Sequence, residues 1–303
     1  MSRPLFARSA KGHLVSRLQR VLSGGGFYSG IVDGDYGGGT ERAVSASQQA
    51  AGLPETGRAD DVTWKRVMHA DIPPLFERCL QLTARIEGHG FTMVAGNFDG
   101  AGLTWGIIGF TLKGGELTAI IREVFTSNPA AVQRAFGDRT EELMSMLAAN
   151  WKTQLAWADS ISSGTRKTTV VEPWRSAFAR LGAEDLVQAN QLRRAEEDYF
   201  VPATQTAKSF GLTTELGSAL CFDVHVQNGG VRDAARAVIK AGLKKAKDQQ
   251  ARRLLIGNAV VDQSSKTFRE DVRKRKVAIA TGEGDVHGEH LRLESWGLGE
   301  FLI

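Results

Sequence analysis

The stretch Asp99-Gly-Ala-Gly-Leu-Thr-Trp-Gly-Ile-Ile-Gly-Phe110 decides how this chain is interpreted. Its first half is rich in glycine, which favours a turn, and residues 104–110 are β-prone. Residues 91–94 are β-prone as well, so the two runs predict a hairpin with the glycine-rich turn between them. A helix is predicted just upstream, over residues 75–87, because apolar residues recur there at helical spacing.

Two carboxyl groups stand out in this region. Glu87 would close the predicted helix, and Asp99 follows twelve positions later in the turn. Taken singly, Glu87 fits a solvated helix end and Asp99 an ordinary Asp-Gly turn. As a pair they suit the hydrolysis of a glycosidic bond. In this reaction one carboxylic acid protonates the glycosidic oxygen, and a second carboxylate either activates a water molecule or attacks the sugar carbon. Apolar neighbours would keep Glu87 protonated as the acid, Asp99 would stay ionised as the base, and Thr104 would hold the water.

The amino-acid composition limits the classes of protein to which this chain can belong. The 303 residues fit one large or two ordinary domains, and 42% hydrophobic with 24% charged residues is typical of a soluble globular chain. No apolar run is long enough for a membrane span. Of the 38 Lys/Arg and 34 Asp/Glu, nine and seven fall in residues 1–72, leaving 29 and 27 for the rest. Neither part has the basic excess of a nucleic-acid binder, so no nucleic-acid partner is expected.

Residues 1–72 are predicted to form one domain. Helices are expected over about 14–22, 40–51 and 61–68, with Thr40 capping the second and Asp60 or Asp61 the third. Glycine-rich loops separate them. This segment resembles the three-helix peptidoglycan-binding domain of many wall hydrolases. The residues that carry the resemblance are Leu18-Gln19, Phe27-Tyr28, Asp33-Gly34, Tyr36-Gly37, Thr40, Ala43-Val44, Gln48, Gly52-Leu53, Gly57 and Thr63-Trp64.

That resemblance implies a role for the loop over residues 33–40. It would place contacts to wall sugar and stem peptide near Asp33, Tyr36 and Thr40. Most of the matching residues are caps, turn glycines and core positions, so the resemblance is mainly structural.

Residues 73–303 are predicted to form a second, mainly helical domain. Besides the helix over 75–87 and the hairpin, helices are expected over about 114–127, 129–136, 138–149, 170–182, 184–198, 213–227, 230–247, 249–262 and 265–279. The expected fold class is therefore mainly α (α+β): a small three-helix domain followed by a two-lobed, lysozyme-like helical domain with one small sheet.

The second domain resembles the chitosanases of glycoside hydrolase family 46, inverting enzymes of the lysozyme superfamily. The Asp-Gly-x-Gly-x-Thr-x-Gly-Ile-Ile-Gly-Phe run stands in full at residues 99–110, although the interval between the two carboxylates is shorter than in typical members. The resemblance places the family's acid on Glu87, its base on Asp99 and its water-positioning threonine on Thr104.

Further positions come from the same resemblance. A helix-opening aspartate falls on Asp223, and a motif with two arginines six apart falls on Arg269 and Arg275. In the family an arginine of this region bridges the acid and the internal aspartate. Arg269 is the first candidate for that charge, with Asp223 balancing it, and Arg275 is the second.

The predicted activity is endo-acting, inverting hydrolysis of the β-1,4 bonds of peptidoglycan, as in a muramidase or lysozyme-like phage endolysin. Chitosan is the second substrate, because a polycation favours an acidic cleft and this domain is nearly balanced in charge. A wall-degrading effector delivered by a secretion system, or a non-catalytic wall-binding adaptor, would look similar. The basic start of the chain lacks an apolar signal run, so synthesis in the cytoplasm and later release to the wall are expected.

No cofactor is predicted, and a monomer is expected. His287 and His290 lack a third ligand with recognised spacing, so no metal site is predicted. His89, close to Glu87, is a weaker candidate for the cleft. Cys79 and Cys221 lie in apolar stretches and are expected to be buried, reduced thiols.

Overall fold

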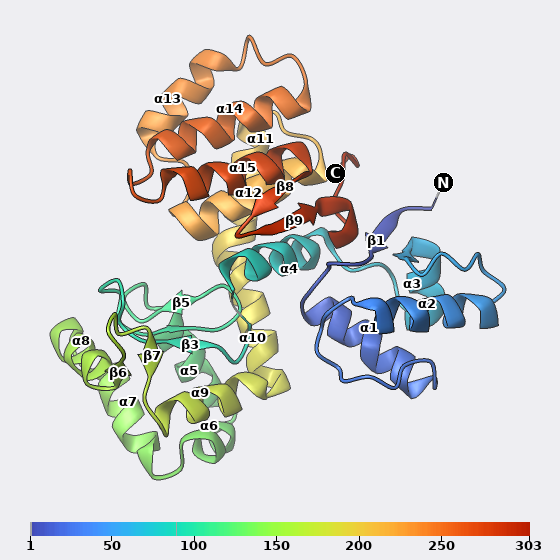
Figure 1. The fold of residues 1–303 in the computed structure, drawn as a ribbon. Helices are drawn as coiled ribbons and strands as arrows, with labels where there is room; N and C mark the ends of the chain where they lie inside the picture. The colour runs from blue at the N-terminus through green and yellow to red at the C-terminus, as the bar shows by residue number, and fades with distance from the viewer. Residues whose placement is uncertain (1, 89) are drawn as a thin grey trace. The chain divides into compact units, whose positions relative to one another are not determined.

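The computed structural model describes residues 2–88 and 90–303. The protein is mainly helical with short antiparallel strand pairs, which confirms the predicted fold class (Figure 1). The chain forms two compact units. The first contains residues up to Ile86 together with Tyr199–Ile303, and the second contains Glu87–Asp198. Within the described ranges, no helix is both long and apolar enough to cross a membrane.

The N-terminal part of the first unit, blue in Figure 1, has the three predicted helices. Its elements are β1 Pro4–Phe6, α1 His13–Gly24, α2 Gly38–Ala50, β2 Ala59–Asp60 and α3 Asp61–Met68. Asp60 caps α3, because its side chain accepts a hydrogen bond from the Thr63 N–H at 2.8 Å. Thr40 was expected to cap α2, and this was wrong. The N-cap is Gly37, and Thr40 lies inside the first turn.

The remaining part of the first unit is a group of helices built around α12. Its elements are α4 Leu75–Glu87, α11 Val201–Ser209, α12 Glu215–Asn228, α13 Asp233–Gly242, α14 Gln249–Asp262, α15 Arg269–Thr281, β8 Glu283–Val286, β9 Glu289–Arg292 and the 3-10 helix Leu293–Trp296. All residues from Glu215 to Val224 are buried, so α12 is the core helix rather than an amphipathic surface helix. The Phe76 ring of α4 lies 6.2 Å from that of Phe222.

The second unit combines short strands with helices. Its elements are β3 Val94–Ala95, β4 Thr104–Trp105, β5 Phe110–Thr111, α5 Glu116–Ser127, α6 Pro129–Phe136, the 3-10 turn Gly137–Arg139, α7 Thr140–Ala148, α8 Trp151–Ser160, β6 Ser162–Ser163, β7 Thr169–Val170, α9 Trp174–Ala183 and α10 Asp185–Ala195. A π-helical turn, Glu196–Phe200, follows α10 and crosses into the first unit. The aromatic core includes Phe178, whose ring lies 5.7 Å from Trp105 and 5.1 Å from Phe136.

The predicted hairpin is instead a three-stranded antiparallel sheet in the order β3-β4-β5. Gly106 and Gly109 have φ values of +89° and +75°, so the chain turns between them and splits the expected strand over residues 104–110 into β4 and β5. Thr104 lies on the central strand, paired with Ala95 on one side and Thr111 on the other.

Candidate active site and wall-binding domain

Glu87 is the last residue of α4 and belongs to the second unit. Gly88 follows it with φ of +71°, the left-handed conformation in which glycine commonly ends a helix. The Glu87 side chain is half-buried, and its Oε1 is shielded from solvent. The sequence prediction that Glu87 closes a helix is therefore confirmed at the level of local structure. His89, the weaker candidate nearby, lies outside the described residues.

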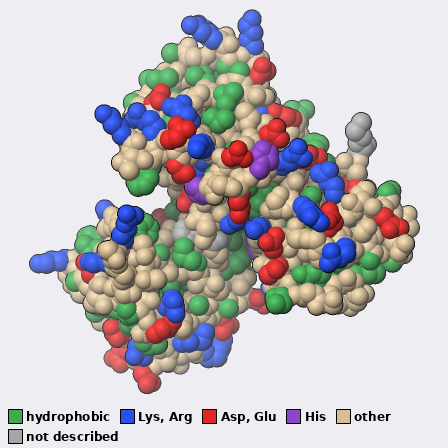
Figure 2. Space-filling model, in the orientation of Figure 1, with side chains coloured by type: hydrophobic (Ala, Val, Ile, Leu, Met, Phe, Trp, Pro, Cys, Tyr) green, Lys and Arg blue, Asp and Glu red, His purple; other side chains and the backbone are tan. Residues whose placement is uncertain are grey.

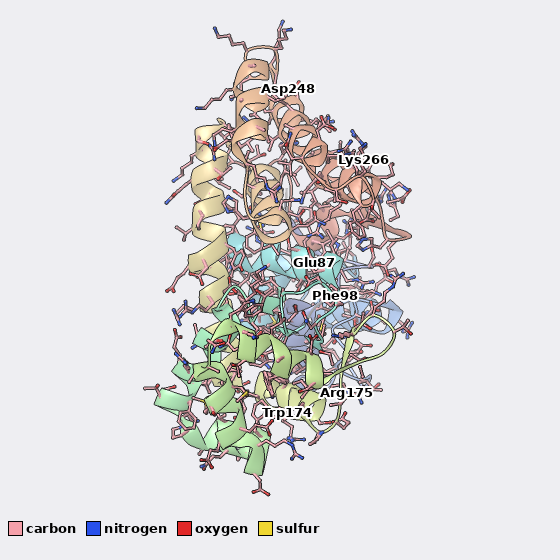
Figure 3. The ribbon with its side chains drawn as sticks, turned by 90° about the vertical axis from the view of Figure 1, so that its left-hand side faces the viewer. Glu87, Phe98, Trp174, Arg175, Asp248 and Lys266 are labelled. Carbon is pink, nitrogen blue, oxygen red and sulfur yellow. The ribbon has the colours of Figure 1, made fainter. Side chains whose placement is uncertain are left out.

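Asp99 lies in the loop that joins β3 to β4, and its side chain is exposed. One of its oxygens, Oδ1, accepts a hydrogen bond from the Ala101 N–H at 3.0 Å. This is an Asx turn, which orders the glycine-rich bend without burying the carboxylate. Figure 3 labels Phe98, the exposed neighbour of Asp99 in this loop, and Glu87 at the end of α4.

The base of this loop is held by side chains that the sequence analysis did not single out. Asn97 Nδ2 donates to Oδ1 of Asp159 at 2.8 Å, and Asn97 Oδ1 accepts from the Gly102 N–H at 2.9 Å. Lys167 Nζ donates to the same Asp159 oxygen at 2.6 Å. The bonds from Lys167 and then Asn97 lower the pKa of Asp159 below its ordinary value. Asp159 is thus an ionised anchor at the end of α8 for the loop that carries Asp99.

The loop approaches the β6–β7 hairpin closely at Gly96. A Cβ at this position would lie 2.5 Å from the Lys167 carbonyl oxygen and 2.6 Å from Ser162 Oγ. The Ser162 hydroxyl oxygen also accepts a hydrogen bond from the Asn97 N–H at 2.9 Å. Only glycine fits at position 96 without displacing the backbone of the hairpin.

Thr104 is 5% exposed, at the start of β4. The sheet is fixed to α10 by Gln191, a fully buried residue whose Oε1 accepts from the Ile107 N–H at 3.0 Å and whose Nε2 donates to the Phe91 carbonyl at 3.1 Å. Trp105 Nε1 donates to the Phe178 carbonyl at 3.2 Å. Glu87, Asp99 and Thr104 therefore all belong to the second unit, on elements with well-defined anchors.

The first unit contains a buried charge cluster around Asp223, which is fully buried in α12. Arg275 donates to both of its carboxylate oxygens, at distances from 2.6 to 3.0 Å, and Lys276 Nζ donates to Oδ2 at 2.6 Å. Thr83 Oγ1 of α4, four residues before Glu87, donates to Oδ1 at 3.4 Å. Burial acts to raise the pKa of Asp223, but the two cations hold it below its ordinary value.

The order of the two arginine candidates is corrected by this geometry. Arg269, the first choice as the charge balanced by Asp223, instead donates to the carbonyls of Asp262 and Ser264, at the end of α14. Arg275 is the arginine that pairs with Asp223. Both arginines are on α15, and the six-residue interval places them on different sides of that helix.

In the N-terminal helical domain, Tyr36 and Thr40 are buried and only Asp33 of the three predicted contact residues is exposed. The Tyr36 hydroxyl donates to the Gly57 carbonyl at 2.8 Å, and burial raises the Tyr36 pKa. The hydroxyl of Thr40 donates to the Asp35 carbonyl at 3.1 Å. Direct contact of Tyr36 and Thr40 with a polymer is therefore not supported, because both hydroxyls face the interior.

A buried glutamine explains why that loop is so well ordered. Gln19 Nε2 lies 2.9 Å from Asp33 Oδ1 and 3.0 Å from Thr40 Oγ1, and Gln19 Oε1 accepts from the Gly34 N–H at 2.8 Å. The Asp35 N–H and then the Gln19 amide lower the pKa of Asp33. The sequence indicated Gln19 as part of the family pattern, and the structure shows that its amide organises the loop.

A pocket of about 480 Å³ lies elsewhere in this domain. It is lined by residues from the ends of α1, α2 and α3, among them Val21, Phe27, Ala50, Arg66 and His69. None of these residues was singled out as a wall contact. The sequence contained only a weak indication of this pocket, because a phenylalanine beside several glycines is common where a helix ends.

Among the described residues, no group of three His, Cys, Asp or Glu side chains could hold a metal ion. The rings of His287 and His290 lie within hydrogen-bond distance of Asp271 and Asp285, at 3.3 and 2.8 Å. Cys79 and Cys221 are free and buried, as predicted.

A helix-end carboxyl and a loop carboxylate near a small sheet, on a helical fold, are the groups that glycoside hydrolysis requires. The family model described as glycosyl hydrolase family 46 matches residues 88–254, more than half of the chain, and the chain belongs to this family. A second model, described as a putative peptidoglycan binding domain, matches residues 11–67. The family 46 match contains Asp99, Thr104 and Asp223.

A comparison with solved structures found similar chains, and the first of the three that follow supports the fold. A structure described as a chitosanase complex has a TM-score of 0.50 at 18% identity, covering 72% of this chain and 95% of that chain. A mutant chitosanase from Bacillus subtilis MY002 complexed with 6 GlcN has a TM-score of 0.49 at 19% identity, covering 73% and 97%. A Gynuella sunshinyii chitosanase in complex with chitotetraose has a TM-score of 0.48 at 15% identity, covering 73% and 98%. Among curated proteins, none matched the sequence.

Proposed function

We propose that this protein is an endo-acting hydrolase of the β-1,4 glycosidic bonds of peptidoglycan glycan strands, and that it lyses bacteria as an endolysin does. The observation that carries the proposal is the presence, in one chain, of a peptidoglycan-binding domain and a family 46 glycoside hydrolase domain. The binding domain would retain the enzyme on an insoluble polymer while the hydrolase domain cuts it. We place the boundary between the two domains at residues 72 and 73.

In this mechanism Glu87 protonates the glycosidic oxygen, and Asp99 removes a proton from the attacking water. The half-buried helix end suits Glu87 for the acid role, and the exposed, ordered loop gives Asp99 access to water. Thr104, at the end of the same loop, positions the water. An inverting enzyme needs carboxyl groups about 6.5–9.5 Å apart, because the water must fit between Asp99 and the sugar. Proton NMR of the first products should then show the inverted anomer.

Chitosan is the second candidate substrate, and membership of family 46 favours it. Charge favours peptidoglycan: residues 73–303 contain 29 Lys/Arg and 27 Asp/Glu, and the face drawn in Figure 2 shows the two signs interspersed over both units. A polycationic substrate is better served by a strongly acidic surface. Release of reducing ends from purified sacculi and from chitosan, measured side by side, tests the ranking. A clear preference for chitosan would reverse it.

We expect the enzyme to act on the wall after it leaves the cytoplasm. The same hydrolytic reaction would also suit an effector that is delivered into the periplasm of a rival cell. A wall-binding adaptor without activity is the non-enzymatic alternative. A turbidity assay on permeabilised Gram-negative cells separates them, because an adaptor binds without clearing the suspension. We expect the enzyme to act as a monomer, which light scattering after size-exclusion chromatography would verify.

A further inference from the structure

A pocket of about 630 Å³ lies in the first unit at the C-terminal end of α12. Its walls come from the end of α12, the start of α13, the end of α14 and the segment that leads into α15. Lys266 is labelled on that last segment in Figure 3. The volume is within the usual range of pockets for small ligands. Neither the proposed acid nor the proposed base lines this pocket, so it is a separate feature of the molecule.

The chemistry of the lining is polar and not acidic. It includes Gln227, Asn228, Arg232, Gln263 and Ser265, and none of the described lining residues is Asp or Glu. Arg232, which is exposed, is the charged member of the set. Such a pocket favours a neutral or anionic ligand and disfavours a polycation.

One lining atom lacks a hydrogen-bond partner. Asn228 Oδ1 is shielded from solvent, and no described group donates to it. A buried acceptor without a donor is unfavourable, because it has lost its hydrogen bonds to water. A small rotation of the Asn228 side chain toward the pocket would let this oxygen accept from the N–H of an acetamido group.

The amide of the neighbouring Gln227 is oriented by the charge cluster. Its Oε1 accepts a hydrogen bond from Lys276 Nζ at 2.8 Å, and Lys276 is in turn bound to Asp223 at 2.6 Å. Because the oxygen is used in this way, the Gln227 Nε2 is the group that remains to donate. The pocket lining therefore offers an oriented donor on Gln227 as well as the acceptor on Asn228.

Phe268 adds an aromatic surface at the pocket. Its side chain is 65% exposed, the most exposed phenylalanine of the described chain. An exposed ring beside amide groups suits the apolar C–H face of a sugar, while the amides meet its polar substituents.

We propose that this pocket binds an N-acetylated glycan segment that carries a carboxylate, the chemistry of a muramyl residue with its lactyl group and stem peptide. Asn228 accepts from the acetamido N–H, Phe268 packs on a sugar face, and Arg232 pairs with the carboxylate. The assignment rests on the proposed function and deepens it, because it names the part of peptidoglycan that distinguishes this polymer from chitosan.

The test measures binding in the full chain with the substitution Glu87→Gln, so that no bond is cut during titration. The probes are N-acetylglucosaminyl-N-acetylmuramyl dipeptide, the same compound with its carboxylates amidated, and a glucosamine tetramer. Arg232→Glu is compared with Lys240→Ala, a control on the exposed part of α13 outside the pocket. Calorimetry should show that Arg232→Glu weakens binding of the acidic probe about 10- to 100-fold, the usual effect of losing a charged hydrogen bond.

The remaining variants and probes show which group of the pocket is responsible for a change in affinity. Lys240→Ala should bind the acidic probe as the parent does, Phe268→Ala should weaken both N-acetylated probes, and amidation should remove most of the difference between the parent and Arg232→Glu. Equal affinity of parent and Arg232→Glu for the acidic probe, or tighter binding of the glucosamine tetramer by the parent, would overturn the proposal. Failure of the proposed function is seen separately, as absence of sacculus hydrolysis by the unmodified enzyme.

Discussion

Asn97 Nδ2 lies 2.8 Å from Asp159 Oδ1, so a single hydrogen bond ties the loop that carries Asp99 to the end of α8. The bonded residues are 62 positions apart in sequence. Because Asn97 also accepts from the Gly102 N–H, its side chain closes the loop across its base. The position of the proposed base therefore depends on a residue with no chemical role of its own.

Replacement of Asn97 by Ala should lower kcat by about 10- to 100-fold, because a displacement of about 1 Å in a catalytic group has effects of this size. Initial rates on soluble glycan fragments measure it. Lys167→Met is the matched control. It removes the other partner of Asp159, but an exposed ion pair of this kind contributes about 0–1 kcal/mol and leaves the Asn97 bond in place. Equal losses in the two variants would show that the Asn97 bond does not position Asp99.

Glu87→Gln should remove the proposed general acid and lower kcat by about 10²–10⁴-fold, while the helix end and the fold are retained. Reducing-end release from sacculi measures the loss, and circular dichroism checks the fold. Glu142→Gln, at an exposed position of α7 in the same unit, should leave the rate unchanged. Near-normal hydrolysis by Glu87→Gln would refute the assignment of the acid.

Asp99→Asn tests the base with little disturbance of the loop. Asparagine keeps the Oδ1 atom that accepts from the Ala101 N–H, so the Asx turn should persist. We expect a loss of about 10²–10⁴-fold in kcat, measured as initial rates on soluble glycan fragments. A variant that keeps its rate would exclude Asp99 as the base.

The parts of the fold that the sequence predicted well have strong local signals. Helix α6 begins and ends where expected, because Asn128 accepts from the Ala131 N–H and Pro129 opens the first turn. Helices α8 and α11 were missed, because their polar and small residues give little amphipathic contrast. The glycines at 106 and 109 signalled turns, but the β-prone residues between them outweighed that signal in the prediction.

The residues of the candidate site also differ in how well the sequence predicted them. Glu87, Asp99 and Thr104 were found because they lie within one short motif. Asn97, Asp159 and Gln191 were missed, because their roles come from contacts 62 to 100 residues apart in sequence. The ion-pair partner of Asp223 was hard to predict for a similar reason. Arg269 and Arg275 have similar sequence contexts, and only the direction in which each side chain leaves α15 distinguishes them.

Binding to the wall should depend on the pocket formed by the ends of α1, α2 and α3 more than on the loop over residues 33–40. The double variant Phe27→Ala/Arg66→Ala removes an exposed ring and an exposed charge from that pocket. We expect it to weaken co-sedimentation with sacculi about tenfold, the effect of losing about 1.4 kcal/mol. Asp33→Asn should change sedimentation much less, and the reverse order would assign wall contact to the loop.

The Asp223 cluster gives a pH-dependent prediction. Asp223→Asn removes the carboxylate shared by two buried cations, so the free energy of unfolding at pH 7 should fall by about 3–5 kcal/mol. Because the pKa of Asp223 is lowered in the folded protein, its contribution is complete above the unfolded value of about 3.9 and is lost as the pH falls through the folded value.

The difference in unfolding free energy between the unmodified protein and Asp223→Asn should therefore be constant near neutral pH and should shrink in strong acid. Urea titrations at several pH values measure it. Asp262→Asn is the control, since Asp262 is exposed and lies 3.7 Å from Arg273, a surface pair that contributes about 0–1 kcal/mol. A difference that stayed as large in acid as at neutral pH could not come from ionisation of Asp223, and the cluster would then act through packing alone.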